Sequence, residues 1–509
     1  MRKLAKWVVA AVAGLAAAPA SATWLKAETA HFIIYVDTDE AKARRYATRL
    51  EGFDAALRRL YGVADDPARR SNRVQVFAFR PGLFQKTCGC YGVLGYYSPA
   101  AGGSAIVSMY TGDVDKTAPA GAMTSQTILL HEYSHHFMYA NFPIAYPLWY
   151  SEGFAEFNAN VLFNDDGSIT IGLPANYRAD AIQDDHVGLN VCDFFAGVTN
   201  MMNHEFIYGR GWIMTHYLTL SSERPGQLAA YLTALNGGKS SWEAAVAAFG
   251  DPQRLFADTG EYRKRKHLAA PLRVPAPAKP PVVTITRLGD GEAALLPLRA
   301  RLAGGAVPAE AKKLLAQART VAADHPRDAL AQTWLARAAL GAGDLAAAEV
   351  AADAAIAALP EAAEAMLVKG EVAIGRLVAA KSGDAAAWTA ARGWLLKANH
   401  ADPDAARPLL LYYRSYVEAH VTPPPGAVRG LSRAVVLAPE DSGAHLLLAR
   451  QLLGAGDAKG ARQLLQPIAY APHGREGENT ARQAIALIDA GKAAEAEQAL
   501  AAAPADKKA

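Results

Sequence analysis

The chain has 509 residues, of which 51% are hydrophobic and 20% charged, and this balance is typical of a globular protein with more than one domain. It carries 52 basic and 49 acidic residues, and residues 1–22 contain three of the cations and no anion. Without them the charge is balanced, which excludes the basic tail or stripe that nucleic acid or an anionic membrane surface would require.

Residues 1–22 are predicted to be a signal peptide. Cations at positions 2, 3 and 6 precede the apolar run Trp7–Ala18, and Ala20-Ser21-Ala22 offers the small residues that signal peptidase needs. The run is too short to span a membrane. We therefore expect cleavage after Ala22, a periplasmic or secreted protein and no membrane span after cleavage; a retained N-terminal anchor is the alternative.

The next segments predict an α/β beginning of a domain over residues 23–267. Alternating apolar residues favour strands at 31–36 and 73–79, and 40–61 has the periodicity of an amphipathic helix between them. A further strand is expected at 105–110, after a glycine-rich loop.

An H-E-x-x-H pattern at positions 131–135 carries the strongest chemical information. Thr124 or Ser125 can cap a helix around it, and residues four apart share one helix face. His131 and His135 are therefore predicted to bind one metal ion, with Glu132 as the general base beside the metal-bound water. Histidines that merely pack in a helix are the alternative, and His136, outside this face, is expected to be structural.

A second helix is expected from Leu148 to about Val161, and it supplies two carboxylates one turn apart. Glu152 is the predicted third metal ligand, seventeen residues after the second histidine. Two imidazoles and one carboxylate leave a position open for water, which is typical of catalytic zinc. Glu156 is predicted to accept the N–H of a ligand histidine, the alternative being a solvated helix charge.

These motifs resemble those of the gluzincin metallopeptidases, including the bacterial peptidase MA-like domains, in which H-E-x-x-H is followed by a glutamate ligand on the next helix. The segment Trp149–Glu156 looks like that ligand helix, and the resemblance covers about residues 24 to 265. It implies a zincin-like α+β domain that hydrolyses peptide bonds with Zn²⁺.

The segment Tyr208-Gly-Arg-Gly-Trp212 is similar to the Tyr-x-x-Gly segment of these enzymes. The resemblance implies that Tyr208 is a catalytic residue that donates a hydrogen bond to the oxyanion. A tyrosine that only packs is the alternative, and His204 and His216 are other candidate donors.

The resemblance also implies an edge strand above the metal, to which an extended peptide adds through backbone hydrogen bonds. An aminopeptidase needs carboxylates for the free amine of its substrate. The candidate segment Gly102–Met109 contains no glutamate, which favours an endopeptidase.

The cysteines are Cys88, Cys90 and Cys192, too few for a cysteine metal site. Export permits a disulfide. Several pairings are open, and we expect a bridge from Cys192 to the loop that holds the other two.

Residues 268–284 are rich in proline and are predicted to form an extended linker. Residues 285–505 are rich in alanine and leucine, and the sequence at 340–348 recurs at 453–461 and, more loosely, at 488–496. The prolines at positions 326, 360, 403, 439, 472 and 504 are separated by 34, 43, 36, 33 and 32 residues. This period resembles tetratricopeptide repeats, which stack into a solenoid; a plain helical bundle is the alternative.

The predicted fold is thus an α+β zincin-like metallopeptidase domain followed by an all-α TPR-like solenoid. The predicted function is an exported zinc-dependent peptidase that acts on a peptide or protein substrate, with a substrate or protein partner recruited by the repeats. A non-catalytic envelope scaffold with a vestigial zinc domain is the alternative from another class, and a hydrolase of non-peptide amides is a third.

Overall fold

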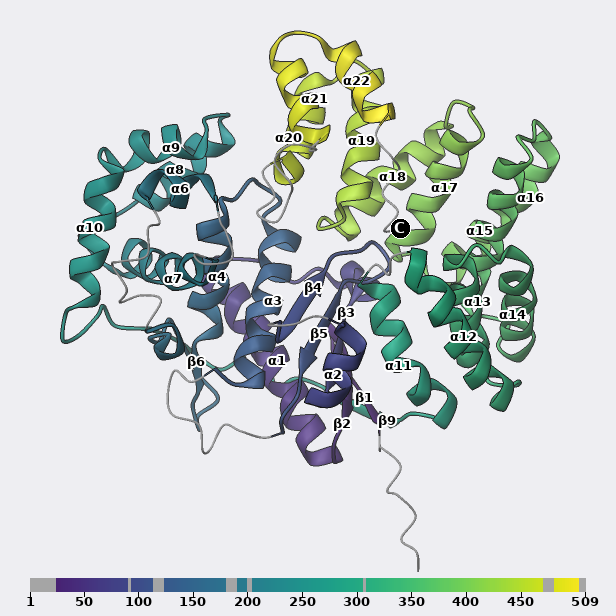
Figure 1. The fold of residues 1–509 in the computed structure, drawn as a ribbon, viewed down its shortest axis with the longest axis horizontal. Helices are drawn as coiled ribbons and strands as arrows, with labels where there is room; N and C mark the ends of the chain where they lie inside the picture. Colours follow the sequence, from purple (N-terminus) through teal and green to yellow (C-terminus); the bar gives the residue numbers. More distant parts are fainter. Residues whose placement is uncertain are drawn as a thin grey trace, which may run out of the picture.

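The computed structural model describes residues 24–89, 93–112, 123–179, 190–198, 204–304, 308–469 and 480–502. The predicted signal peptide and Cys90 lie outside these ranges. A sheet lies at the centre of Figure 1 with helices on both of its faces, and the C-terminal helices run around it from the right of the view to the top. Within the described ranges, no helix has the length and apolar character needed to cross a membrane.

Among the described residues, the central sheet has six strands in the order β4-β5-β3-β2-β1-β9. Its parallel centre consists of β2, β3 and β5, whereas β1, β4 and β9 are antiparallel to their neighbours. The strands expected at 31–36, 73–79 and 105–110 are found as β2, β3 and β5. The strand bounds are Trp24–Glu28 for β1, Phe32–Asp37 for β2, Val74–Phe79 for β3, Gly95–Ser98 for β4, Ala105–Met109 for β5 and Thr284–Arg287 for β9.

Alternating side chains of the central strands bury the two faces of the sheet against different helices. Ile34, Val76 and Ile106, which are register partners, lie in one core with α1 (Glu40–Tyr61) and α3 (Ser125–Asn141). Their chain neighbours Tyr35, Phe77 and Val107 lie in a second core with α2 (Pro81–Cys88) and α11 (Asp290–Ala303). The helix predicted at 40–61 is α1, which begins after the cap Asp39 and ends at the left-handed Gly62.

The proline-rich segment that was predicted to be an extended linker also supplies a strand. Within 268–284, β8 (Leu272–Val274) pairs with β7 (Ile169–Ile171), which pairs with β6 (Val161–Phe163). The following strand, β9, then pairs with β1, and α11 covers the sheet. The extended proline-rich segment keeps enough free backbone donors and acceptors to complete both sheets.

Two glycines allow α4 (Leu148–Ala159) and α7 (His204–Leu220) to cross with their backbones in contact. A Cβ at Gly153 would collide with the Gly211 carbonyl, and a Cβ at Gly211 would collide with the Trp149 carbonyl. The surrounding helices are α6 (Val191–Ala196), α8 (Gln227–Asn236), α9 (Ser241–Phe249) and α10 (Pro252–Arg263), with short 3₁₀ turns η1 (Pro67–Asn72) and η2 (Asn176–Arg178).

The predicted disulfide from Cys192 is wrong. Cys192 is free and exposed on α6, whereas Cys88, at the end of α2, is disulfide-bonded. The sheet separates the two residues, because α2 packs with α11 on one face while α6 packs with α4 and α9 on the other side of the domain.

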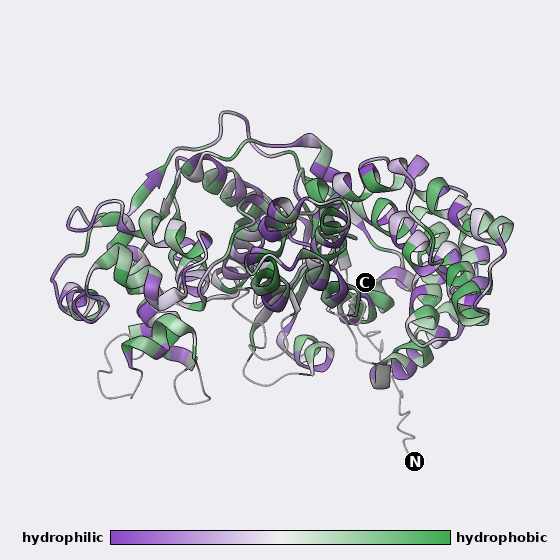
Figure 2. Cartoon of the chain, turned by 90° about the horizontal axis from the view of Figure 1, so that it is seen from above, coloured by the Kyte–Doolittle hydropathy of each residue, from purple (hydrophilic) through white to green (hydrophobic). Residues whose placement is uncertain are grey.

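Beyond α11 the described chain is entirely helical, and each helix packs on the next. Hydrophobic and hydrophilic stripes run side by side along these helices (Figure 2), as expected for stacked units that share a core. The helices are α12 (Pro308–Asp324), α13 (Ala329–Gly341), α14 (Leu345–Ala358), α15 (Ala363–Ala379), α16 (Ala385–Ala401), α17 (Ala406–Glu418), α18 (Pro425–Leu437), α19 (Ser442–Gly454), α20 (Ala458–Ala469), α21 (Thr480–Asp489) and α22 (Ala493–Ala502).

The turns show that these helices form repeated pairs. Gly343, Gly456 and Gly491 have positive φ between the two helices of a pair, and Lys381 and His420 hold the equivalent left-handed position in two further pairs. The repeating prolines from Pro326 to Pro439 fall between pairs. The helical-repeat solenoid is therefore confirmed as an architecture.

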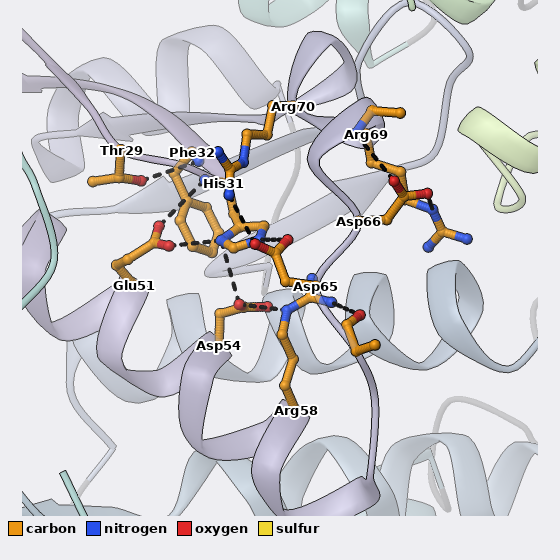
Figure 3. Close-up of polar contacts among 12 residues, drawn as sticks. Thr29, His31, Phe32, Glu51, Asp54, Arg58, Asp65, Asp66, Arg69 and Arg70 are labelled. Carbon is orange, nitrogen blue, oxygen red and sulfur yellow. Dashed lines mark hydrogen bonds and ion pairs between the residues drawn. The ribbon is translucent and has the colours of Figure 1, made fainter. Parts of the chain in front are cut away.

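A cluster of charges, buried at Glu51 and Asp54 and exposed at Asp65 and Arg70, joins the start of β2 to α1 (Figure 3). His31 Nδ1 lies 2.6 Å from Glu51 and 3.4 Å from Asp54, and its Nε2 lies 3.0 Å from Asp65. Arg58 and Arg70 pair with Asp54 and Asp65 respectively, so three cations offset three carboxylates once His31 is protonated. Burial opposes the charged form, but the Glu51 hydrogen bond and the nearby carboxylate charges raise the pKa of His31 to about 9.

Replacing Gly211 by Ala tests the helix crossing. We expect a loss of about 1–3 kcal/mol in the free energy of unfolding, because the added methyl group overlaps the backbone of α4. Gly260→Ala in α10 is the matched control, since no atom lies within 4 Å of its Cβ and the helix gains up to ~1 kcal/mol. Urea unfolding that gives equal values for both variants would contradict the crossing.

The His31 cluster predicts a pH-dependent stability. The folded-state pKa of about 9 exceeds the ordinary 6.5, so the cluster contributes fully below pH 6.5 and loses its contribution as pH rises through 9. The difference in unfolding free energy between wild type and His31→Gln should therefore shrink from pH 6 to pH 9.5. The exposed His267→Gln is the control and should show a difference that stays small and constant; a constant difference for His31→Gln would show that His31 is not protonated in the fold.

Candidate metal centre

The two predicted histidine ligands lie on one face of α3, as their spacing requires. The helix begins after Thr124, whose side chain accepts a hydrogen bond from the Thr127 amide. His131 Nε2 and His135 Nε2 are 3.2 Å apart. Glu152, on α4, places its Oε2 atom 3.3 Å from the first nitrogen and 3.5 Å from the second.

These three spacings fit a tetrahedral zinc ion. Ligand atoms at the usual zinc distances of about 2.0–2.1 Å lie about 3.3–3.4 Å from one another in a tetrahedron. The donor set of two imidazole nitrogens and one carboxylate oxygen is one that zinc accepts, and it leaves one position for water. Glu152 is only 1% exposed and His135 only 6%, so the carboxylate is removed from solvent in a place where a cation would offset its charge.

The charge around the site favours a positive ion. Burial lowers the pKa of His131, but the hydrogen bond with Glu152 and the charges of Glu156, Glu152 and Glu132 outweigh burial and raise this pKa to about 9. The same negative potential that stabilises a protonated imidazole would stabilise a divalent cation at this point.

Glu156 lies behind the first ligand rather than in solvent. Its side chain is 1% exposed, and its Oε1 atom is 3.6 Å from His131 Nδ1, longer than a hydrogen bond. Arg178 pairs with the same oxygen at 2.8 Å and the Tyr177 hydroxyl donates to the other. The alternative of a solvated helix charge is therefore wrong, and the carboxylate is held close to the ligand histidine.

Sequence reasoning missed Tyr177 and Arg178. They lie in η2, outside any helix or strand that carries a motif. The one signal was indirect, since a glutamate on a buried helix next to a metal ligand needs donors from elsewhere in the chain.

The second ligand histidine is supported from α3 and α4. The Ser151 hydroxyl lies 3.4 Å from His135 Nδ1 and 2.9 Å from the Tyr139 hydroxyl, and the Tyr139 ring stacks on the His135 ring at 6.2 Å. His136 points elsewhere, as expected: its Nδ1 atom lies 3.2 Å from the Tyr97 hydroxyl, and burial lowers its pKa to about 3.

The edge strand next to α3 is β4, and the sequence did not predict this strand. The expected strand at 105–110 is β5, one position further in. Gly95 lets β4 approach α3, because a Cβ there would lie 2.8 Å from Ile128 Cγ2 and 3.3 Å from Glu132 Cγ. The strand therefore passes directly over the predicted general base, and its residues, Gly-Tyr-Tyr-Ser, contain no glutamate.

Tyr208 lies at the metal centre. Its ring is 5.9 Å from the His131 ring, and the Arg178 guanidinium lies 4.7 Å above it. Burial, together with the charges of Glu152 and Glu132, raises the pKa of Tyr208 well above its ordinary value, so the hydroxyl keeps the proton that the predicted donor role requires.

The alternative donors have different positions. His216 is buried between Phe157, Trp212 and Tyr262, and the Tyr262 hydroxyl lies 3.0 Å from its Nδ1 atom. That cluster is two helical turns from Tyr208 along α7, so the assignment of His216 as a donor is wrong. The side chain of His204 lies outside the described residues.

Comparisons with known proteins do not identify the chain. No family model and no curated protein matches it. A solved structure of a protein described as "MamA RS-1 ArsTM double mutant" matches with 20% identity over 35% of this chain and 93% of that chain, at a TM-score of 0.26. A TM-score of 0.26 identifies neither a shared fold nor a shared activity.

Two variants separate the ligand role from the base role. Glu152→Ala should lower zinc affinity by at least about tenfold, since even loss of an outer partner of a ligand costs 10–100-fold. Glu132→Gln should retain one zinc per chain, because Glu132 is not in the ligand set. Zinc content after dialysis, read by atomic spectroscopy, checks both, and unchanged zinc in Glu152→Ala would disprove the ligand assignment.

Proposed function

We propose that the chain is a zinc-dependent peptidase. The observation that supports this most strongly is the convergence of His131, His135 and Glu152 at the spacing of a tetrahedral zinc site. Glu132 follows the first ligand on the same helix, and Tyr208 approaches from α7. A purely structural zinc site would close its fourth position and would need neither a general base nor a hydrogen-bond donor.

The roles of the side chains follow from their positions. Zinc bound by the three ligands would supply a Lewis acid and a water of lowered pKa. Glu132 takes the proton of the attacking water and returns it to the leaving amine. Tyr208, which stays protonated in its buried position, donates a hydrogen bond to the oxyanion that develops on the substrate carbonyl.

The substrate class follows from the edge strand. At the end of the sheet, β4 has no further strand partner among the described strands, and it passes over Glu132. An extended peptide can add to such an edge through backbone hydrogen bonds, which recognise a main chain rather than one particular side chain. The absence of a glutamate in β4 favours internal cleavage, because no carboxylate on this strand would bind a free N-terminal amine.

The wider role is also a proposal. Residues 1–22 would direct the chain to the periplasm or the medium, and the TPR-like repeats would contribute to recognition of a substrate or a protein partner. The second candidate function is an envelope scaffold in which the zinc centre no longer turns over peptides; the two differ in whether Glu132 acts as a base.

Cleavage of a diverse peptide library tests the proposal. Zinc-loaded chain lacking residues 1–22 is compared with its Glu132→Gln variant, and mass spectrometry identifies the products. We expect cuts by the wild type that fall by at least about a hundredfold in the variant, a loss typical of removing a general base. N-acetylated peptides should be cut as well.

The contrary outcomes are distinct. Cleavage restricted to free N-termini would replace the endopeptidase by an aminopeptidase. Equal cleavage by both proteins would reject Glu132 as the base, and no cleavage by either, with zinc bound, would favour the scaffold.

A further inference from the structure

The repeat region holds the loop that follows the edge strand. Residues 99–104 join β4 to β5, and Ala101 at the centre of this loop is 3% exposed. Ala101 belongs to the hydrophobic core of the repeats, with Leu410, Tyr413 and Leu431 of α17 and α18. A loop of the sheet domain thus contributes to the hydrophobic core of the repeats.

Two adjacent carboxylates at the start of α19 bind this loop. Asp441 caps α19 by accepting from the Ala444 amide at 2.7 Å, and its second oxygen accepts from the Ala101 amide at 2.7 Å. Glu440 Oε1 accepts from the Ser104 hydroxyl at 2.8 Å. One carboxylate therefore ties the loop to the helix it caps, and the other ties the end of the loop to the same turn.

Glu440 also reaches the helix that carries the metal ligands. Its Oε1 atom is 3.8 Å from His136 Nδ1, and that nitrogen is 3.2 Å from the Tyr97 hydroxyl of β4. The Tyr97 ring stacks on Tyr139, which also stacks on the His135 ring. A continuous set of contacts therefore runs from the repeats through β4 to a metal ligand.

The burial of Glu440 indicates a role beyond simple packing between the repeats and the sheet domain. Its side chain is 4% exposed, and burial raises its pKa to about 7. A buried carboxylate without a bidentate cation partner is costly compared with an apolar side chain of the same size. Glu440 accepts a hydrogen bond from Ser104 of the β4–β5 loop, and the positive charge of Arg69 partly offsets its own charge. An apolar residue could not accept this hydrogen bond.

We propose that Glu440 and Asp441 are positioning residues for the peptidase, which act from the repeat region to hold the β4–β5 loop so that β4 stays in register above α3. This inference rests on the proposed function. It assigns the repeats a second role, which is to support the active site in addition to recruiting a substrate or partner. Without these two contacts, β4 keeps its pairing with β5 and the hydrogen bond from Ser98 to the Ala303 carbonyl, but the loop that follows β4 is no longer held by α19. Peptide binding along β4 should then weaken more than the chemical step.

The test uses zinc-loaded chain lacking residues 1–22 and four variants. Glu440→Ala removes the acceptor for Ser104, whereas Glu440→Gln keeps an acceptor oxygen and serves as the rescue. Asp441→Asn has one oxygen, which can cap α19 or bind Ala101 but not both. Asp402→Ala is the matched control. Asp402 accepts a hydrogen bond from the Ser71 hydroxyl at 2.7 Å, so this substitution removes a contact between the repeats and the sheet domain that lies away from the β4–β5 loop.

We expect KM for a cleaved peptide to rise about tenfold in Glu440→Ala and Asp441→Asn, the loss expected for one or two hydrogen bonds, with a smaller change in kcat. Glu440→Gln and Asp402→Ala should stay within about twofold of wild type. Hydrogen exchange of residues 94–109 should become faster in Glu440→Ala and Asp441→Asn and should stay unchanged in the other two variants. The proposal would be overturned if Glu440→Ala and Asp441→Asn had the same KM and kcat as Asp402→Ala. It would also be overturned if these two variants lost kcat and thermal stability while KM stayed unchanged.

Hydrogen exchange separates this proposal from the proposed function, since it needs no turnover. If the wild type cuts no peptide while exchange at 94–109 still depends on Glu440, the peptidase proposal fails and the positioning of β4 by the repeats stands. If peptides are cut but Glu440→Ala changes neither the hydrogen exchange of residues 94–109 nor KM, the positioning role is wrong and the peptidase proposal stands.

Discussion

The contact between the backbones of α4 and α7 is the constraint on which the metal centre depends. Gly153 and Gly211 leave no room for a side chain between the two helices. Gly153 directly follows the ligand Glu152, and Gly211 lies one turn after Tyr208. Because the helices touch at this point, the predicted third ligand Glu152 and the proposed donor Tyr208 lie close to the same face of α3, and a larger residue at either glycine would push α4 and α7 apart.

The second constraint is electrostatic. Glu152 and Glu156 are both 1% exposed, and Glu132 lies on the adjacent face of α3. Carboxylates at this burial need cations, which Arg178 supplies on the far side of Glu156 and which His131 or a metal ion supplies at the centre. The arrangement therefore fits the proposed cation site, with the outer carboxylate Glu156 already paired with Arg178.

The repeats and the sheet domain are parts of one folded unit. Strand β9 and helix α11 complete the sheet domain from beyond the proline-rich segment, and the β4–β5 loop enters the core of the repeats. Segments from each part of the chain therefore pack into the other part, so the solenoid is not an independent domain on a flexible linker. This explains why the carboxylate of Glu440, more than 300 residues from His131 in the sequence, can lie 3.8 Å from His136 on α3.

Local patterns in the chain were enough to predict the bounds of α1, the ligand spacing on α3, the position of Glu152 on the next helix and the repeating helix pairs. Such features depend on caps, turns and periodicity within a few residues. Long-range packing was needed to establish that β4 is the edge strand, that Tyr177 and Arg178 hold Glu156, and that Cys192 is far from Cys88. These outcomes depend on strand order and on contacts between distant segments, which no local pattern encodes.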